Sequence, residues 1–207
     1  MKKFNKDFKT KLYQIIEDIE NDSLVELVSI IKDSSGNYRD VSFFSGAILL
    51  FWAYTYFMFA PTIFDVYLIY FLTILAFLIG FVLVEFIRPL KRVFSGKKRI
   101  EKNVEVYSRA IFQKGGIRHT KEKIGVLIYV SLFEKKVKII ADRGAENMIP
   151  IEKWDEIKES FQTVFTASDF QTTFLEKLKN CQKIFSEYIP SQEDDINELP
   201  DNLDIEM

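Results

Sequence analysis

The chain has 207 residues and a mass of 24.3 kDa, which allows one ordinary domain with an accessory element, or two small domains. Hydrophobic residues make up 48% of it, with 20 Phe against 8 Gly and 5 Pro, a composition that excludes disordered and collagen-like chains. The net charge is −2, but residues 193–207 hold seven acids and no Lys or Arg. The rest of the chain shows no basic stripe interleaved with aromatic side chains, so a nucleic-acid-binding surface is not expected.

The first forty residues predict one helix and one strand. Apolar residues recur at spacings of three and four over residues 4–21, the pattern of an amphipathic helix. The segment LVELVSIIK, residues 24–32, is short and rich in β-branched residues, which favours a strand. A polar loop, DSSGNYRD, follows it.

Residues 41–86 contain no Lys or Arg, and their only charged residues are Asp65 and Glu85. The run divides into two apolar stretches of about 22 residues each, or about 33 Å of helix against a hydrocarbon core of about 30 Å. Two buried core helices are the alternative, but a domain of this size rarely encloses two helices that are apolar on every face. We therefore predict a transmembrane helical hairpin.

The distribution of basic residues predicts the orientation of this hairpin. The turn between the spans carries no base, whereas Lys32 and Arg39 precede the first span and six bases follow the second. The positive-inside rule then places both termini and the soluble domain in the cytoplasm, on a multi-pass protein of the inner membrane. The six bases are also candidate contacts for lipid headgroups, the alternative being that they only fix topology: Arg88, Lys91, Arg92, Lys97, Lys98 and Arg99.

The second half of the chain predicts a helix over 99–114 that ends at Gly115 and Gly116, a strand pair over 125–132 and 135–141, and two further helices before Pro190. If the strand at 24–32 is a parallel neighbour of 125–132, the membrane hairpin is an insertion in the crossover between them. The expected organisation is a first domain part at 1–40, the hairpin at 41–88, a second domain part at 89–190, and an acidic mobile tail at 191–207.

Motifs for catalysis are sparse in this sequence. There is no Walker loop or GxGxxG, and His119 and Cys181 are the only residues of their types. We expect a loop or capping role for His119 and a buried apolar role for Cys181. Arg39 and Asp40 are expected to form a local ion pair at the headgroup level.

Carboxylates leave open one kind of metal site. Asp142 and Glu146 follow the strand at 135–141, with Glu152 a few residues on, and such hard oxygen ligands suit Ca²⁺ or Mg²⁺. An ordinary solvated loop is the alternative. Glu134 is not expected to join them, because about eight residues of strand place it roughly 25 Å away.

Four segments carry a resemblance to a known family: GVLIYVSLFEKKVKIIADRG at 125–144, IEKWDEI at 151–157, SSGNYRD at 34–40 and NELPD at 197–201. They resemble the TPM domain family, and within it a bacterial membrane branch in which two spans interrupt the domain. The resemblance implies a small α/β/α sandwich interrupted by the two-helix transmembrane hairpin. It also implies an acidic, calcium-associated groove and weak acid phosphatase activity, with Asp142 and Gly144 matching the family pattern. Ile149, Pro150 and Ile151 stand where many members carry a later Leu, Pro and Asp.

Three functions follow as hypotheses. The first is a membrane-anchored, non-enzymatic module that binds or maintains a membrane protein complex. The second is a divalent-metal-dependent phosphatase in which Asp142 is the candidate catalytic residue and Glu146 and Glu152 are further metal ligands. The third is a lipid-facing scaffold that uses the six bases after the second span.

Overall fold

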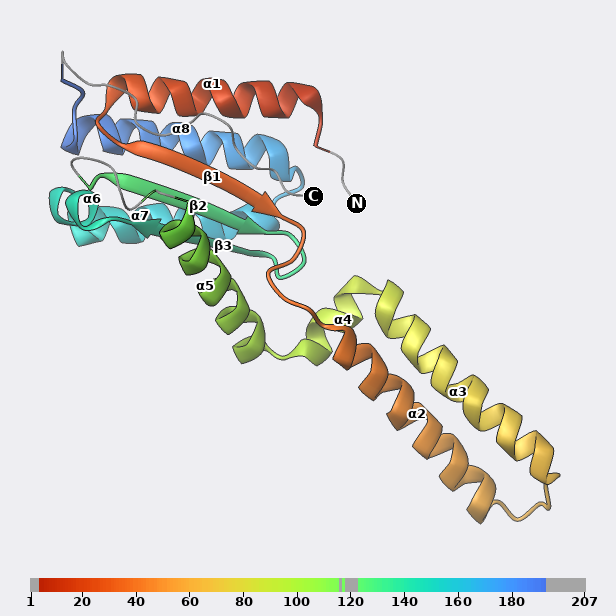
Figure 1. Cartoon of the computed structure of the whole chain (residues 1–207). Helices are drawn as coiled ribbons and strands as arrows, with labels where there is room; N and C mark the ends of the chain where they lie inside the picture. The colour runs from red at the N-terminus through yellow and green to blue at the C-terminus, as the bar shows by residue number, and fades with distance from the viewer. Residues whose placement is uncertain (1–3, 116, 118–122, 193–207) are drawn as a thin grey trace. The chain divides into compact units, whose positions relative to one another are not determined.

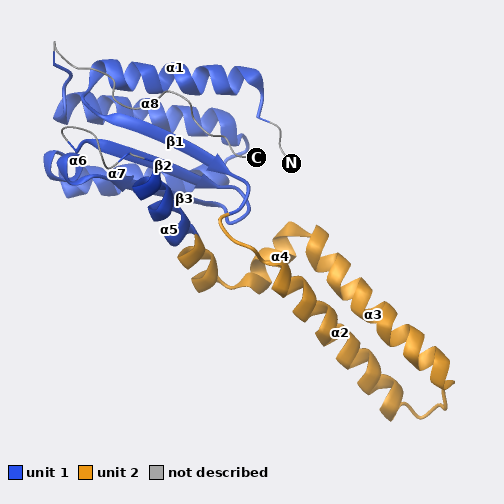
Figure 2. Ribbon diagram, viewed as in Figure 1, with its two compact units in different colours: residues 1–34, 104–207 blue, residues 35–103 orange. Residues whose placement is uncertain are grey.

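A computed structural model describes residues 4–115, 117 and 123–192 of the chain. His119, Gly116 and residues 193–207 lie outside the described residues, so the expectations for the histidine, the glycine pair and the acidic tail concern a part that the structure does not describe. The chain divides into two compact units, one of residues 1–34 with 104–207 and one of residues 35–103 (Figure 2).

The first unit is built on a three-stranded sheet. Its strands are β1 (Glu26–Lys32), β2 (Gly125–Ser131) and β3 (Lys136–Ala141), in the spatial order β1-β2-β3. β1 runs parallel to β2 from the pair Glu26 and Gly125 onward, and β3 returns antiparallel to β2. The predicted parallel pairing of the first two strands is therefore confirmed. β2 is buried along its whole length, which explains its nearly continuous apolar sequence.

Helices cover both faces of this sheet (Figure 1). On one face Val126, Ile128 and Val130 of β2 join a core with α1 (Lys6–Asp22), α7 (Ile151–Gln162) and α8 (Phe170–Tyr188). On the other face Leu127 and Tyr129 pack with the end of α5 (Lys97–Lys114). Successive strand residues point to opposite faces, so β2 serves two cores at once. The predicted α/β/α sandwich is confirmed.

Short helices account for most differences from the sequence-based prediction. The structure adds α4 (Arg88–Ser95), α6 (Arg143–Met148) and a 3₁₀ helix (Thr163–Phe165), none of which was predicted. The segment after β3, expected as a loop, is thus a helical turn that begins at Asp142. One or two turns of helix carry too little apolar periodicity to be recognised from sequence.

The second unit holds the apolar hairpin of α2 (Arg39–Phe59) and α3 (Val66–Phe86). Asp65 caps α3, because its carboxylate accepts hydrogen bonds from the backbone N–H of Tyr67 and Leu68. Both helices are long and apolar enough to cross a membrane, and only 17% and 11% of their most apolar windows are buried. Core helices of a soluble domain would be mostly buried, so these are candidate membrane spans.

Candidate functional site

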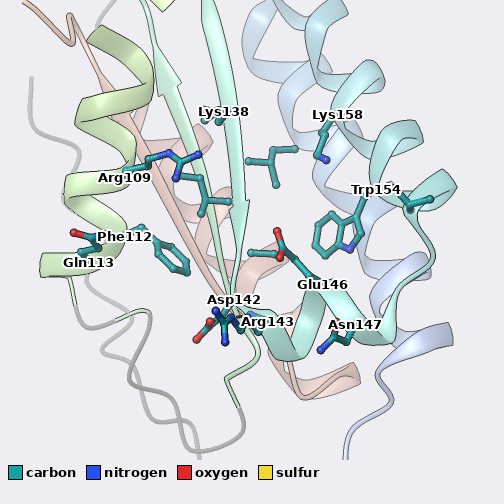
Figure 3. A pocket seen from close by; sticks show the side chains of 14 residues that line it. Arg109, Phe112, Gln113, Lys138, Asp142, Arg143, Glu146, Asn147, Trp154 and Lys158 are labelled. Carbon is teal, nitrogen blue, oxygen red and sulfur yellow. Dashed lines mark hydrogen bonds between the residues drawn. The ribbon is translucent and has the colours of Figure 1, made fainter. Parts of the chain in front are cut away.

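A cleft of about 720 Å³ runs along the outer edge of β3. The strand forms its floor, from Lys138 to Ala141. Arg109 and Phe112 of α5 line one side, while α6 and α7 line the other (Figure 3). The cleft exists because β3 is the last strand of the sheet and helices flank both of its faces.

The backbone of β3 presents hydrogen-bonding groups to this cleft. The N–H of Asp142 donates to the carbonyl of Gly125 at 2.8 Å, so within the β2–β3 register Lys138 and Ile140 also bond toward β2. In an antiparallel pair, every second residue directs its backbone N–H and C=O groups away from the partner strand. Val137, Ile139 and Ala141 therefore direct their N–H and C=O groups outward, and the latter two lie on the floor of the cleft.

Basic side chains dominate the charge of the lining. Arg109, Lys138, Arg143 and Lys158 line the cleft, against the two acids Asp142 and Glu146. Lys158 lies 3.7 Å from Asp155 on its own helix. An excess of positive charge around a groove of this size favours an anionic ligand.

Glu105 of α5 holds two of these cations in place. Lys138 lies 2.5 Å from its carboxylate, which also pairs with Arg109. Burial raises the pKa of Glu105, but the hydrogen bonds from Lys138 and Arg109 outweigh it and the pKa is lowered from 4.5. One carboxylate shared by two cations leaves positive charge at the α5 side of the cleft.

Two buried polar atoms at the cleft lack a hydrogen-bond partner among the described residues. Asp142 is 7% exposed; its Oδ1 accepts the Arg143 N–H at 2.8 Å, while its Oδ2 has no partner. Trp154 is 5% exposed, projects from α7 toward β3, and leaves its indole N–H without an acceptor (Figure 3). Orphaned buried polar groups are uncommon in folded proteins, so this unpaired acceptor and unpaired donor are candidate groups for binding a ligand in the cleft.

The predicted metal ligands are only partly brought together. Asp142 and Glu146 line the cleft, whereas Glu152 is not among its lining residues. Across 4–115, 117 and 123–192, no group of three or more His, Cys, Asp or Glu side chains is arranged to hold a metal ion. The three carboxylates are therefore not gathered into one cluster among the described residues, and Ca²⁺ or Mg²⁺ binding stays a prediction.

Glu134 lies at the opposite end of β3, in the turn from β2. It is buried at 3% exposure and accepts hydrogen bonds from the hydroxyls of Ser34 and Ser131. Its separation from Asp142 along the sheet agrees with the sequence-based expectation.

Cys181 lies in the core beside α1 and α7, as expected, at 1% exposure. Burial raises the pKa of its thiol to about 12. A thiol held neutral in this way is neither a nucleophile nor a metal ligand at neutral pH.

The bases after the second span have two different environments. Lys91 pairs with Glu85 at 2.8 Å, and Arg99 donates two hydrogen bonds to Asp40. The expected Arg39–Asp40 pair is therefore wrong: Asp40 sits at the first turn of α2, where the guanidinium of α5 reaches it. Lys97 and Lys98 are exposed, and a headgroup role for the six bases stays a prediction.

The cleft itself was not predicted from the sequence, although Asp142 and Glu146 were singled out. Arg109, Lys138, Lys158 and Trp154 come from three elements that only the folded sheet brings together. The available signal was Lys136 and Lys138 alternating on the last strand, which indicates an edge but not a cleft.

Comparisons with known proteins identify the domain. Residues 93–184 match the family model described as the TPM domain. Among solved structures, the chain is similar to the BA42 protein of the psychrophilic bacterium Bizionia argentinensis, determined by NMR, with a TM-score of 0.59. The two are 16% identical, and the similarity covers 98% of this chain and 94% of that chain. At this identity the likeness shows the fold.

Comparison with curated proteins gives no match. The segments that carried the resemblance at 125–144 and 151–157 lie within the matched residues, and the fold agrees with the match. Residues 93–184 therefore match the TPM domain family, and the fold of the chain is similar to that of the BA42 protein.

Proposed function

We propose that this protein is a membrane-anchored TPM domain that binds, through the cleft at β3, a component of a membrane protein complex. The hairpin α2–α3 is the anchor, and the domain lies on the cytoplasmic side. The role is one of binding or maintenance, without a reaction of its own.

The observation that carries this proposal is that one chain combines an exposed apolar hairpin with an open sheet edge. Two helices whose apolar side chains are mostly exposed are stable in water only at a high cost, and a bilayer removes that cost. An open strand edge between two helices, with unpaired polar atoms and excess positive charge, is a docking site for protein segments.

The orientation of the anchor is supported by charge. The turn between α2 and α3 contains Asp65 and no base, while the segments outside both spans are basic. The positive-inside rule places such flanks in the cytoplasm.

The test is recovery of bound proteins from native membranes, using the full chain after chemical cross-linking. Arg143→Glu with Lys158→Glu reverses two charges of the cleft, and Lys179→Glu with Lys183→Glu makes the same charge change on the exposed face of α8. We expect wild type and the α8 control to recover the same membrane proteins and the cleft variant to recover them at least tenfold less. Equal recovery by the cleft variant, or no specific protein with any of them, would contradict the proposal.

A divalent-metal-dependent phosphatase is the second candidate. It is favoured by the buried Oδ2 of Asp142, which has no hydrogen-bond partner among the described residues and lies in the same cleft as Glu146. The experiment is phosphate release from a generic monoester by the detergent-purified chain, with Ca²⁺, Mg²⁺ or chelator. Metal-dependent turnover that Asp142→Asn abolishes would establish this function in place of the first; no turnover under any condition removes it.

A further inference from the structure

We infer that the apolar hairpin carries a binding site for one anionic phospholipid, in a groove that α2, α3 and α4 enclose. The site is separate from the cleft at β3, and it rests on that part of the proposed function which places the hairpin in a bilayer. All of its lining residues lie within the unit of residues 35–103 (Figure 2).

The groove has a volume of about 660 Å³, within the range of about 300–1,000 Å³ that ligand sites occupy. α2 lines it with a stripe of residues between Asp40 and Leu49, spaced so that they share one face of the helix. α3 adds Gly80, Leu83 and Val84 from the opposite side. A Cβ at Gly80 would lie 2.9 Å from the Ser45 carbonyl oxygen, so the two helices touch along the groove.

The apolar lining faces the surroundings of the hairpin. Val41 and Val84 are buried, so the base of the groove is closed. Phe44, Ile48 and Leu83 are exposed, although each is a large apolar side chain. Such a surface is costly in water, and a hydrocarbon chain that enters the groove removes that cost.

α4 supplies a third wall at one end of the hairpin. Leu90 and Phe94, four residues apart, both line the groove. Lys91 of the same helix pairs with Glu85 of α3 at 2.8 Å, and Glu85 accepts a hydrogen bond from Ser42 of α2 at 2.7 Å. These contacts fasten α4 to both long helices, so the wall is held in place.

The length of the groove matches one leaflet of a bilayer. From Asp40 to Leu49 the helix rises about 14 Å, at about 1.5 Å per residue, and half of a hydrocarbon core is about 15 Å. A transmembrane helix of a partner is about twice as long as this lining. An acyl chain that enters from the headgroup level and ends in the middle of the bilayer fits its length.

The mouth of the groove is polar and cationic. Arg99 lines it, pairs with Asp40 and donates a hydrogen bond to the Asn37 carbonyl at 3.0 Å, yet its side chain remains 40% exposed. Lys97 and Lys98 directly precede it and are exposed. Residues 88–99 as a whole hold six bases and no acid. An apolar groove that opens at such a segment suits a lipid with an anionic phosphate headgroup.

The test is native mass spectrometry of the full chain in mild detergent, with phosphatidylglycerol added. We expect one phosphatidylglycerol to be retained per chain, and phosphatidylcholine with the same acyl chains to bind at least tenfold more weakly. Arg99→Gln should lose most of this preference, whereas Lys102→Gln, an equal charge change on an exposed position of α5, should keep it. Bound phosphatidylglycerol should also raise the thermal midpoint, because a ligand of the folded chain stabilises it.

Filling the groove tests the acyl site. Ile48→Trp with Leu83→Trp places two large side chains in it, and Ile74→Trp with Leu78→Trp makes the same substitutions at exposed positions of α3 that do not line it. The groove variant should bind phosphatidylglycerol at least tenfold more weakly than wild type, and the control should bind it equally. In wild type, which needs no variant to fold, a phosphatidylglycerol with a diazirine on its acyl chain should label residues 40–49 more than residues 70–79.

Four results would overturn the inference: equal retention by the groove variant, equal binding of the two headgroups by wild type, even labelling of both segments, or displacement of phosphatidylglycerol by an equal concentration of palmitate. The last would show that a carboxylate serves as well as a phosphate headgroup. If no lipid is retained but the variant of the β3 cleft still loses its partners, the proposed function stands without this site.

Discussion

Cys181 lies on the buried face of α8, in the hydrophobic core that this helix shares with the sheet, and is 1% exposed. Burial raises its pKa to about 12, so almost no thiolate is present at pH 7. We predict that maleimide labels Cys181 at least about 100-fold more slowly in the folded chain than in urea, because labelling requires opening of the core. Lys183→Cys, exposed on the same helix, supplies the control. Equal labelling of the two thiols in the folded chain would show that the α8 core is not closed.

Glu85 and Lys91 form an ion pair at the end of α3. Their Nζ–Oε2 distance is 2.8 Å, the lysine side chain is only 11% exposed, and Ser42 donates a second hydrogen bond to the glutamate at 2.7 Å. Glu85→Leu leaves a buried ammonium group without its partner, and we expect a loss of about 2 kcal/mol in the free energy of unfolding. Lys91→Met added to it should restore most of that loss. The double-variant cycle in detergent measures this, and additive losses would show that the pair is not coupled.

Glu105 gives the first unit a dependence on acid pH. Its pKa is lowered in the folded state by Lys138 and Arg109 despite burial, so the unfolded chain binds the proton more readily. The stabilisation is complete above the ordinary value of 4.5 and is lost as the pH falls through the lower folded value. The urea midpoints of wild type and Glu105→Gln should therefore differ at pH 7 and converge as the pH falls below 4.5. A difference that does not change with pH would contradict the assignment; Glu176→Gln, exposed on α8, is the control.

Close approach of α2 and α3 depends on two glycines. A Cβ at Gly46 would lie 2.8 Å from the Phe77 carbonyl oxygen, and one at Gly80 would lie 2.9 Å from that of Ser45. Both obstacles are backbone atoms, which do not move aside as a flexible side chain does. Gly80→Val is expected to separate the helices at a cost of about 1–3 kcal/mol. It should lower the thermal midpoint of the full chain in detergent, whereas Leu75→Val, on an exposed face of α3, should leave it nearly unchanged.

Helices and strands with a clear pattern of apolar residues were predictable from the sequence. The contacts between these elements were not. The strand LVELVSIIK was expected at 24–32 and forms at Glu26–Lys32, because its β-branched residues suit a half-buried strand wherever it pairs. α6 was missed because six residues are too few to show a helical period. The pairing of Asp40 with Arg99 joins residues 59 positions apart, so local sequence favoured the neighbouring Arg39 instead.

The domain that contains the sheet is built from two separate segments of the sequence. β1 pairs with β2 although the hairpin α2–α3 lies between them in the chain. The candidate site shares this property, since α5, β3 and α7 each contribute one side of the cleft. Its acids were visible in the sequence after β3, but the sheet edge that turns them into a cleft arises only from the tertiary fold.

Membrane crossing with the domain on the cytoplasmic side is the central claim, and the accessibility of single cysteines in intact cells tests it directly. Thr62→Cys lies in the exposed turn between α2 and α3, Lys98→Cys lies in the exposed segment after the second span, and Cys181 is buried in both variants. We predict that a membrane-impermeant maleimide labels residue 62 in intact cells and residue 98 only after the cells are permeabilised. Labelling of residue 98 in intact cells, or of neither residue until permeabilisation, would contradict the account.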